Sequence, residues 1–189
     1  MKTVLFVTGN TRKVWQAQSV GKEFGITVEQ LVIDTPEIQS HDSLAITIAK
    51  AEAAFVQVQK PLVVCDYSWG ISALKGFPGG YMRDVTEWFE ADDFLALMRD
   101  KKDRSVLLTD SVVYIDAQGY TVFQKEFHGK IIKEARGTGN VSIDQVVVFD
   151  GQEKTIAENV DRNTHSRDLR QSAWHAFAQW LKDTQQISG

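Results

Sequence analysis

The chain has 189 residues, of which 43% are hydrophobic and 24% charged, which is the balance of an ordinary globular protein. Its formal net charge of −4 excludes the broad basic field of a general nucleic-acid binder. The single cysteine, Cys65, excludes an internal disulfide, and no apolar run approaches the roughly 20 residues that span a bilayer. We therefore expect a cytoplasmic protein without a membrane or nucleic-acid partner.

Strands and helices alternate in the predicted first part of the chain. Short apolar runs indicate the strands, and apolar side chains at helical spacing indicate the helices. Gly25 suits the end of the first helix, and Asp42 or Ser43 suits the start of the second. The predicted strands cover residues 4–7, 27–33 and 62–64, and the predicted helices cover residues 13–24 and 44–58.

The second part of the chain is richer in strand patterns. A loop with three glycines and Pro78 over 76–80 comes first, and Gly119 supplies a hairpin turn farther on. The further predicted helices cover 92–98 and 168–182, and the further strands cover 105–115, 120–127 and 146–149. Alternation followed by a run of strands predicts an α/β protein with a mixed sheet.

The first candidate site lies between the first strand and the first helix. There, Thr8, Gly9 and Asn10 precede Lys13, which lies about one turn into the helix. A glycine allows close backbone approach, and the N–H groups of a helix start favour a phosphate. From spacing alone, an ordinary strand–helix turn with a solvated lysine is the more frequent explanation of such a segment, because short glycine motifs have many false positives. The second glycine of a Walker loop is missing.

A pair of separated carboxylates forms the second candidate site. Glu37 lies in a polar loop, and Asp66 stands at the predicted end of a buried strand, where open α/β sheets place their ligands. Lys50 lies on the helix between them. Two carboxylates with room for waters and phosphate oxygens suit Mg²⁺, although each alone is more often a helix cap or a surface charge.

Several motifs in order resemble the Ham1 or inosine-triphosphatase family of nucleoside-triphosphate pyrophosphatases. Thr-Gly-Asn-x-x-Lys is similar to the opening signature of that family. The further similar segments are 36–39, 48–51, Asp66 with 73–81, the pairs Arg136-Gly137 and Ala157-Glu158, and Arg170 in the last helix. The resemblance spans nearly the whole chain, with matching order and spacing.

The resemblance implies a single domain over residues 1–189 with two lobes, a long mixed sheet flanked by helices, and a nucleotide cleft between the lobes. It also implies a homodimer that uses Mg²⁺ to cut a nucleoside triphosphate, such as a deaminated purine nucleotide, between the α- and β-phosphates. Catalysis is implied for Lys13 and Asp66, and metal binding for Glu37 and Asp66. The implied substrate-binding residues are Thr8, Gly9, Asn10, Lys13, Lys50, Asp144 and Arg170.

The chain also departs from the pattern of that family. Gln16 stands where a glutamate is usual, and Cys65 replaces one residue of an acidic pair. The loop whose aromatic residue stacks on the base becomes 140–145, with Val141 at the aromatic position and only Asp144 retained. The Ser-His-Arg cluster that reads the base becomes Asp168-Leu169-Arg170. We therefore expect altered base selectivity.

Some alternatives stay open at this stage. Tyr67, Trp69 or Trp88 could stack on the base instead, and a shifted alignment would use 165–167 in place of 168–170. Asp168 could simply cap the last helix. Besides an active pyrophosphatase, the chain could be a catalytically impaired relative that binds a nucleotide. An unrelated dinucleotide-binding domain is disfavoured because no Gly-x-Gly-x-x-Gly follows the first strand.

Overall fold

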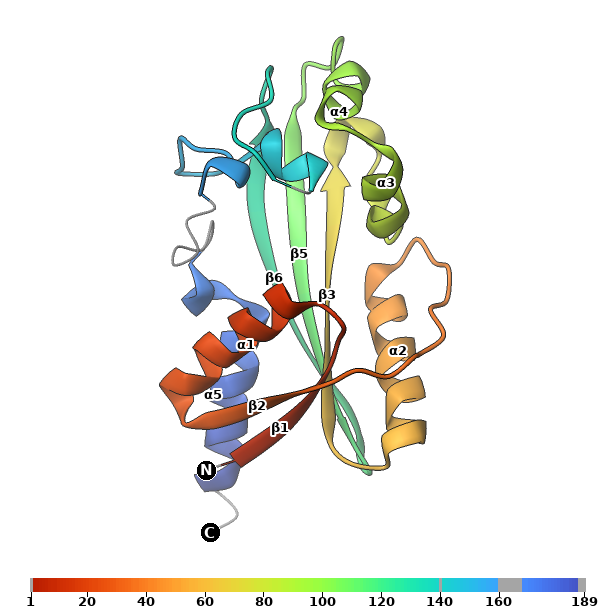
Figure 1. Ribbon diagram of the computed structural model, residues 1–189, viewed down its shortest axis with the longest axis vertical. Helices are drawn as coiled ribbons and strands as arrows, with labels where there is room; N and C mark the ends of the chain where they lie inside the picture. Colours follow the sequence, from red (N-terminus) through yellow and green to blue (C-terminus); the bar gives the residue numbers. More distant parts are fainter. Residues whose placement is uncertain (1, 140, 160–167, 187–189) are drawn as a thin grey trace. The chain divides into compact units, whose positions relative to one another are not determined.

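A computed structural model describes residues 2–139, 141–159 and 168–186 (Figure 1). Its seven-stranded sheet has the order β2-β1-β3-β5-β6-β7, and β4 pairs with β3 outside this path. Pairing is parallel between β1 and both β2 and β3, and antiparallel between β3 and β4 and between β6 and β7. The strands are β1 (Lys2–Val7), β2 (Ile26–Leu31), β3 (Leu62–Ile71), β4 (Phe77–Gly79), β5 (Ser105–Asp116), β6 (Gly119–Ile131) and β7 (Val147–Phe149). The predicted α/β class with a mixed sheet is confirmed.

The chain forms two compact units, which we call unit 1 and unit 2. Unit 1 comprises Met1–Tyr67, Asp110–Lys125 and Leu169–Gly189, and unit 2 comprises Ser68–Thr109 and Glu126–Asp168. The strands β3, β5 and β6 contribute residues to both units. The expectation of a single domain with two lobes and a cleft between them stays a prediction.

In unit 1, helices bury both faces of the sheet. Alternate residues of a strand point to opposite faces, so Val63 and Cys65 of β3 join one core while Leu62 and Val64 join the other. The first core is covered by α1 (Thr11–Phe24) and α5 (Ala173–Gln186), which lie side by side in Figure 1. The second is covered by α2 (Ser43–Val58).

Local chemistry explains where the helices of unit 1 begin and end. The side chain of Asn10 caps the start of α1 by accepting hydrogen bonds from Arg12 N and Lys13 N. The side chain of Asp42 caps the start of α2 in the same way, through Leu44 N and Ala45 N. Gly25 ends α1 with a φ of 69°, a left-handed conformation that glycine adopts without strain. The predicted caps at Asp42 and Gly25 are therefore confirmed.

Unit 2 packs short helices against its part of the sheet. These are α3 (Met82–Trp88) and α4 (Ala91–Leu97), with Phe94 of α4 fully buried. Rings add to the packing, since Trp69 stacks on Phe149 with centroids 6.0 Å apart and planes 10° apart. No helix in the described ranges has both the length and the apolar character needed to cross a membrane.

Two predicted elements need correction, and one helix was missing from the prediction. The strand predicted over 62–64 continues to Ile71, because β4 pairs with residues Trp69, Gly70 and Ile71 of β3. The helix predicted over 168–182 begins only at Ala173, after a short 3₁₀ turn, η4 (Leu169–Gln171). The prediction also lacked α3, whose only buried residue is Val85, so that the sequence shows no apolar periodicity there.

Candidate active site

The turn between β1 and α1 is closed by its own side chains. Thr8 Oγ1 accepts a hydrogen bond from Asn10 N at 3.1 Å. Asn10 Oδ1 accepts bonds from Arg12 N at 3.0 Å and Lys13 N at 3.2 Å. The predicted triphosphate contacts of Thr8 and Asn10 remain predictions, and the structure gives these side chains a definite role in shaping the turn.

Gly9 occupies open space in this turn. A Cβ placed on Gly9 would meet no atom of the described residues within 4 Å, and the φ of Gly9 lies outside the left-handed region. Neither packing nor backbone strain within the chain therefore requires glycine here. Close approach of a bound group to the backbone is the remaining physical reason for a glycine at this position.

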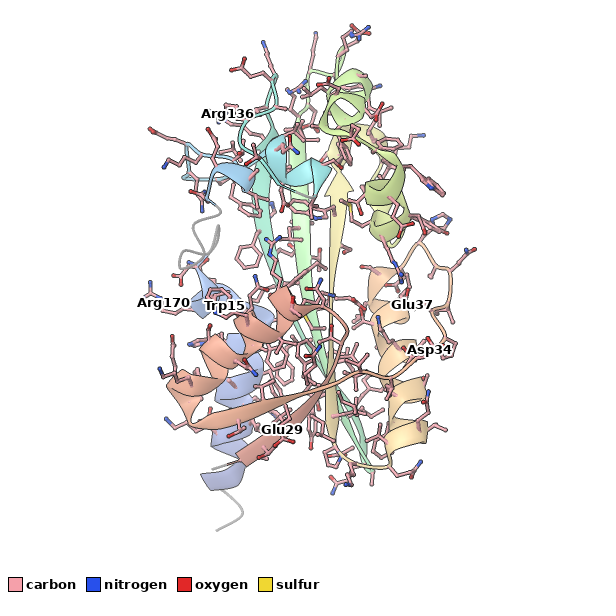
Figure 2. The ribbon with its side chains drawn as sticks, viewed as in Figure 1. Trp15, Glu29, Asp34, Glu37, Arg136 and Arg170 are labelled. Carbon is pink, nitrogen blue, oxygen red and sulfur yellow. The ribbon has the colours of Figure 1, made fainter. Side chains whose placement is uncertain are left out.

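Four charged side chains of unit 1 come together beside this turn. Lys13 Nζ lies 2.8 Å from Asp66 Oδ1, and Lys50 Nζ lies 3.9 Å from Asp66 Oδ2 and 2.7 Å from Glu37 Oε1. Figure 2 shows Glu37 in the loop between β2 and α2, close to α2. We call Lys13, Asp66, Lys50 and Glu37 the charge row, because cations and anions alternate along it. All four were candidate site residues from the sequence.

Asp66 holds the centre of the charge row. It lies within β3 and past Val63, the last β3 residue that pairs with β1, rather than at the end of the strand as predicted. Its Oδ2 atom is buried and has no hydrogen-bond donor in the described part of the chain. Lys50, at 3.9 Å, is close enough to form an ion pair with this oxygen but too far to donate a hydrogen bond.

Lys13 is held firmly in its charged form. Nζ also donates a hydrogen bond of 2.8 Å to the carbonyl oxygen of Cys65, and the side chain is 15% exposed. Burial lowers the pKa of Lys13, but the charge of Asp66 and the hydrogen bond to it, with help from Asp110, outweigh burial and raise the pKa. Lys13 is therefore a cation at neutral pH, as a phosphate-binding residue must be.

Two of the residues that depart from the pattern of the similar family, Gln16 and Cys65, are buried in unit 1. Gln16 is 6% exposed and accepts a hydrogen bond of 2.7 Å from the hydroxyl of Tyr67. Cys65 is buried, with its Sγ 3.9 Å from Asp110 Oδ1. Neither position therefore carries a carboxylate.

Asp110 is a buried carboxylate that was missing from the sequence-based candidates. It is fully buried on β5, and Oδ2 accepts a hydrogen bond of 3.1 Å from Ala173 N at the start of α5. In the sequence, Asp110 stands within a run of strand-forming residues. An ionised side chain is rarely fully buried without partners, so an aspartate in a predicted buried strand indicates a position with a specific role.

Arg170 lies apart from the charge row. It is exposed on η4, and Figure 2 shows it beside Trp15 of α1, on the other side of unit 1 from Glu37. The idea that Asp168 caps the last helix is wrong, because Ser172 Oγ accepts the hydrogen bond from His175 N, 3.2 Å away. The alternative segment 165–167 lies outside the described residues.

Asp144 belongs to unit 2. It is 8% exposed within the 3₁₀ turn η2 (Ser142–Gln145), which Val141 precedes. Of the aromatic side chains considered for base stacking, Trp69 is buried against Phe149, so it is not accessible to a base. Trp88, in contrast, is 73% exposed on α3.

Two residue pairs of the second half that are similar to the family pattern, Arg136-Gly137 and Ala157-Glu158, pack on each other in unit 2. A Cβ at Gly137 would lie 2.7 Å from the backbone of both Ala157 and Glu158, and the φ of Gly137 is +80°. Arg136 Nε lies 3.6 Å from Glu158 Oε2, and Thr155 Oγ1 donates to Arg136 O at 3.0 Å. These pairs therefore have a structural role.

Sequence comparisons extend over almost the whole chain. The model of the Ham1 family matches residues 4–180. A dITP/XTP pyrophosphatase of Methanopyrus kandleri is 31% identical over 181 residues, which cover 95% of this chain and 96% of the relative. A dITP/XTP pyrophosphatase of Methanosarcina mazei is 32% identical over 182 residues, which cover 96% of this chain and 98% of that relative.

Comparison of structures identifies the same fold. A HAM1 protein from Coxiella burnetii superposes with a TM-score of 0.81 at 18% identity, covering 97% of this chain and 100% of that one. At this identity the likeness shows the fold alone.

Proposed function

Since the chain belongs to the Ham1 family, we propose that it is a nucleoside-triphosphate pyrophosphatase acting on non-canonical purine nucleotides. The reaction would release pyrophosphate and leave the nucleoside monophosphate. The names of the relatives support this activity. The charge row is the single structural observation that supports assigning the activity to particular residues.

The charge row offers the groups that triphosphate hydrolysis needs. Lys13 and Lys50 are separated by only one carboxylate, and their ammonium groups can bind oxygens of neighbouring phosphates. The open space at Gly9 lets a phosphate approach the backbone beside Lys13. We propose that Thr8, Asn10 and these residues together hold the triphosphate.

The residues present fit a magnesium ion. Mg²⁺ keeps several waters and takes one or two protein carboxylates together with phosphate oxygens of the substrate. Asp66 Oδ2 is a buried carboxylate oxygen without a hydrogen bond, and Glu37 reaches the same cluster through Lys50. No group of three or more metal-binding side chains occurs in the described ranges, so the protein would supply two carboxylates and the substrate the rest. Bound there, Mg²⁺ would offset negative charge on the phosphates.

Asp66 is the proposed base of the reaction. A water oxygen bonds to a phosphorus of the α–β bridge, its proton passes to the Asp66 carboxylate, and the bridging P–O bond breaks to release pyrophosphate. Lys13, fixed by Asp66 Oδ1 and the carbonyl of Cys65, stabilises the charge that develops on the phosphate oxygens.

Base selectivity is the part of the function in which this chain should differ from its relatives. We propose that Asp144 and Arg170 contact the base, with no ring at Val141 to stack on it. Specificity needs groups that bond the correct base edge and are left unpaired by the wrong one. We therefore expect kcat/KM for ITP and XTP to exceed that for GTP, ATP and CTP by less than about a hundredfold.

Pyrophosphate release from a panel of nucleoside triphosphates tests the activity. The panel should be assayed with Mg²⁺, with EDTA, and with excess Mg²⁺ restored after EDTA. We expect pyrophosphate and not orthophosphate, only in the samples with free metal. The rival function is a catalytically impaired nucleotide binder, which is favoured by Gln16 and Cys65 because neither position carries a carboxylate that could bind the metal. It would be supported if calorimetry detects nucleotide binding while the whole panel shows no turnover.

We also propose that the protein is a cytoplasmic homodimer. Among the described residues of unit 2, Trp88 is the largest exposed apolar side chain, and contact with a second copy of the chain would remove it from water. Its neighbour Phe89 instead packs inward on Phe94. Sedimentation equilibrium of the wild type and Trp88→Glu would test this, and a monomeric wild type would contradict it.

A further inference from the structure

Tyr67 forms one wall of the Lys13 site. It follows Asp66 on β3, and its ring centroid lies 5.1 Å from Lys13 Nζ. At this distance the negative face of the ring attracts the ammonium group. Lys13 is therefore bounded by a carboxylate, the carbonyl oxygen of Cys65 and an aromatic ring.

Gln16 fixes the position of that ring. The hydroxyl of Tyr67 donates a hydrogen bond of 2.7 Å to Gln16 Oε1, and Gln16 is 6% exposed. Gln16 lies on α1 three residues after Lys13, so one helix carries both the lysine and the support for its ring. A buried amide with a short hydrogen bond has little freedom to move, and the ring is held with it.

We propose that Tyr67, anchored by Gln16, is a positioning residue that keeps the Lys13 ammonium group directed at the triphosphate. This inference rests on the proposed function, because it gives Lys13 a phosphate to bind. The structure also gives a use to the departure at Gln16, since its neutral amide accepts the phenol hydrogen bond without adding a charge beside Lys13. It also argues against Tyr67 as a base-stacking residue, since the ring and the hydroxyl are both engaged.

Two variants separate the ring from its hydroxyl group. Tyr67→Phe keeps the ring and loses the bond to Gln16, so kcat/KM should fall about fivefold, the usual effect of one lost neutral hydrogen bond. Tyr67→Leu also loses the attraction between ring and cation, so the loss should reach about thirtyfold or more. Tyr114→Phe is the matched control, because Tyr114 is another partly buried tyrosine of unit 1 whose hydroxyl donates to Asp116 at 3.0 Å. It should leave kcat/KM unchanged.

The base dependence of the loss tells positioning from stacking. A residue that positions Lys13 acts on phosphates, so each Tyr67 variant should lose the same factor with ITP, XTP, GTP and ATP. If the loss instead differs more than about tenfold among bases, Tyr67 contacts the base and the proposal is wrong.

Binding of inorganic tripolyphosphate with Mg²⁺ gives a readout that is independent of turnover. By calorimetry, Tyr67→Leu should weaken this binding about tenfold in the wild-type background and not at all in a Lys13→Met background, because the residue acts through Lys13. Equal weakening in both backgrounds, or none in either, would overturn the proposal. If the wild type turns over no nucleotide but this coupling is present, the proposed activity fails while the positioning role stands. Thermal unfolding of each variant identifies any that do not fold, and in that case the comparison rests on Tyr67→Phe.

Discussion

Replacing Asp66 with asparagine would remove one negative charge from the centre of the charge row with almost no change in shape. In Asp66→Asn, the Lys13 ammonium loses its charged acceptor at 2.8 Å and keeps the carbonyl of Cys65. The buried Oδ2 position, which we propose binds metal, becomes half of an amide. We expect kcat/KM to fall well over tenfold, because losing a group that supports the metal or the water typically costs several kcal/mol and about 1.4 kcal/mol is a factor of ten.

The same substitution should lower stability by a smaller amount. The side chains of Lys13 and Asp66 are 15% and 26% exposed, which places their ion pair between surface pairs worth about 0–1 kcal/mol and fully buried pairs whose breakage costs about 3–5 kcal/mol. We therefore expect a loss of about 1–3 kcal/mol. Because the pKa of Lys13 is raised, its contribution is complete below the ordinary value of 10.5 and declines only as pH rises through the folded value. The contribution of this ion pair to the stability of the wild type should thus be constant from pH 7 to 9.

Pyrophosphate release and urea unfolding measure the two effects separately. The control is Asp34→Asn, an exposed aspartate in the same loop as Glu37, which should change neither quantity. If Asp66→Asn keeps kcat/KM within about threefold of the wild type while it remains folded, the metal and the water are held elsewhere and the proposed site is wrong.

Three further predictions follow from glycines and a tyrosine. Gly9→Ala should keep or slightly raise stability, by up to about 1 kcal/mol, yet raise KM, whereas the control Gly139→Ala, also in open space, should leave KM alone; a Gly9→Ala enzyme with unchanged KM would mean that no phosphate approaches this turn. Gly21→Ala should destabilise by about 1–2 kcal/mol in urea, because its Cβ would lie 2.7 Å from a β2 carbonyl oxygen and overpacking exceeds the gain in helix propensity; equal stability would show that α1 shifts freely. Burial raises the pKa of Tyr114 from its ordinary value of 10.0 to about 12, so the free energy of unfolding should decline as pH rises from 10.0 to about 12. The decline should be smaller in Tyr114→Phe, and identical pH profiles of the two proteins would refute the assignment.

The sequence predicted best where local chemistry decides the structure. The cap at Asp42, the end of α1 at Gly25 and the α/β order all depend on neighbouring residues or on periodicity, and all are present. Elements whose limits depend on tertiary contacts were predicted poorly. β3 extends to Ile71 through its pairing with β4, which has only three residues and leaves almost no pattern in the sequence.

Charged candidates were predicted better than their surroundings. The motif spacing selected Lys13, Glu37, Lys50 and Asp66, and the structure brings all four together. The contact between Gln16 and Tyr67 joins residues that are 51 positions apart, and no rule of spacing could have paired them. In the sequence, Gln16 stood out only because a glutamate is usual at its position. Its proposed role depends on the hydrogen bond with Tyr67, which only the structure shows.

The alternation of the charge row constrains how this site can change over generations. The charges of its two ammonium and two carboxylate groups sum to zero. Replacing any one of them by a neutral residue therefore leaves a net charge on the other three. A second replacement on the opposite sign can restore the balance, so the fitness effects of such changes depend strongly on one another. Substitutions in this region should therefore be accepted mainly in compensating pairs, and Gln16 and Tyr67, which are joined by a hydrogen bond, should likewise change together.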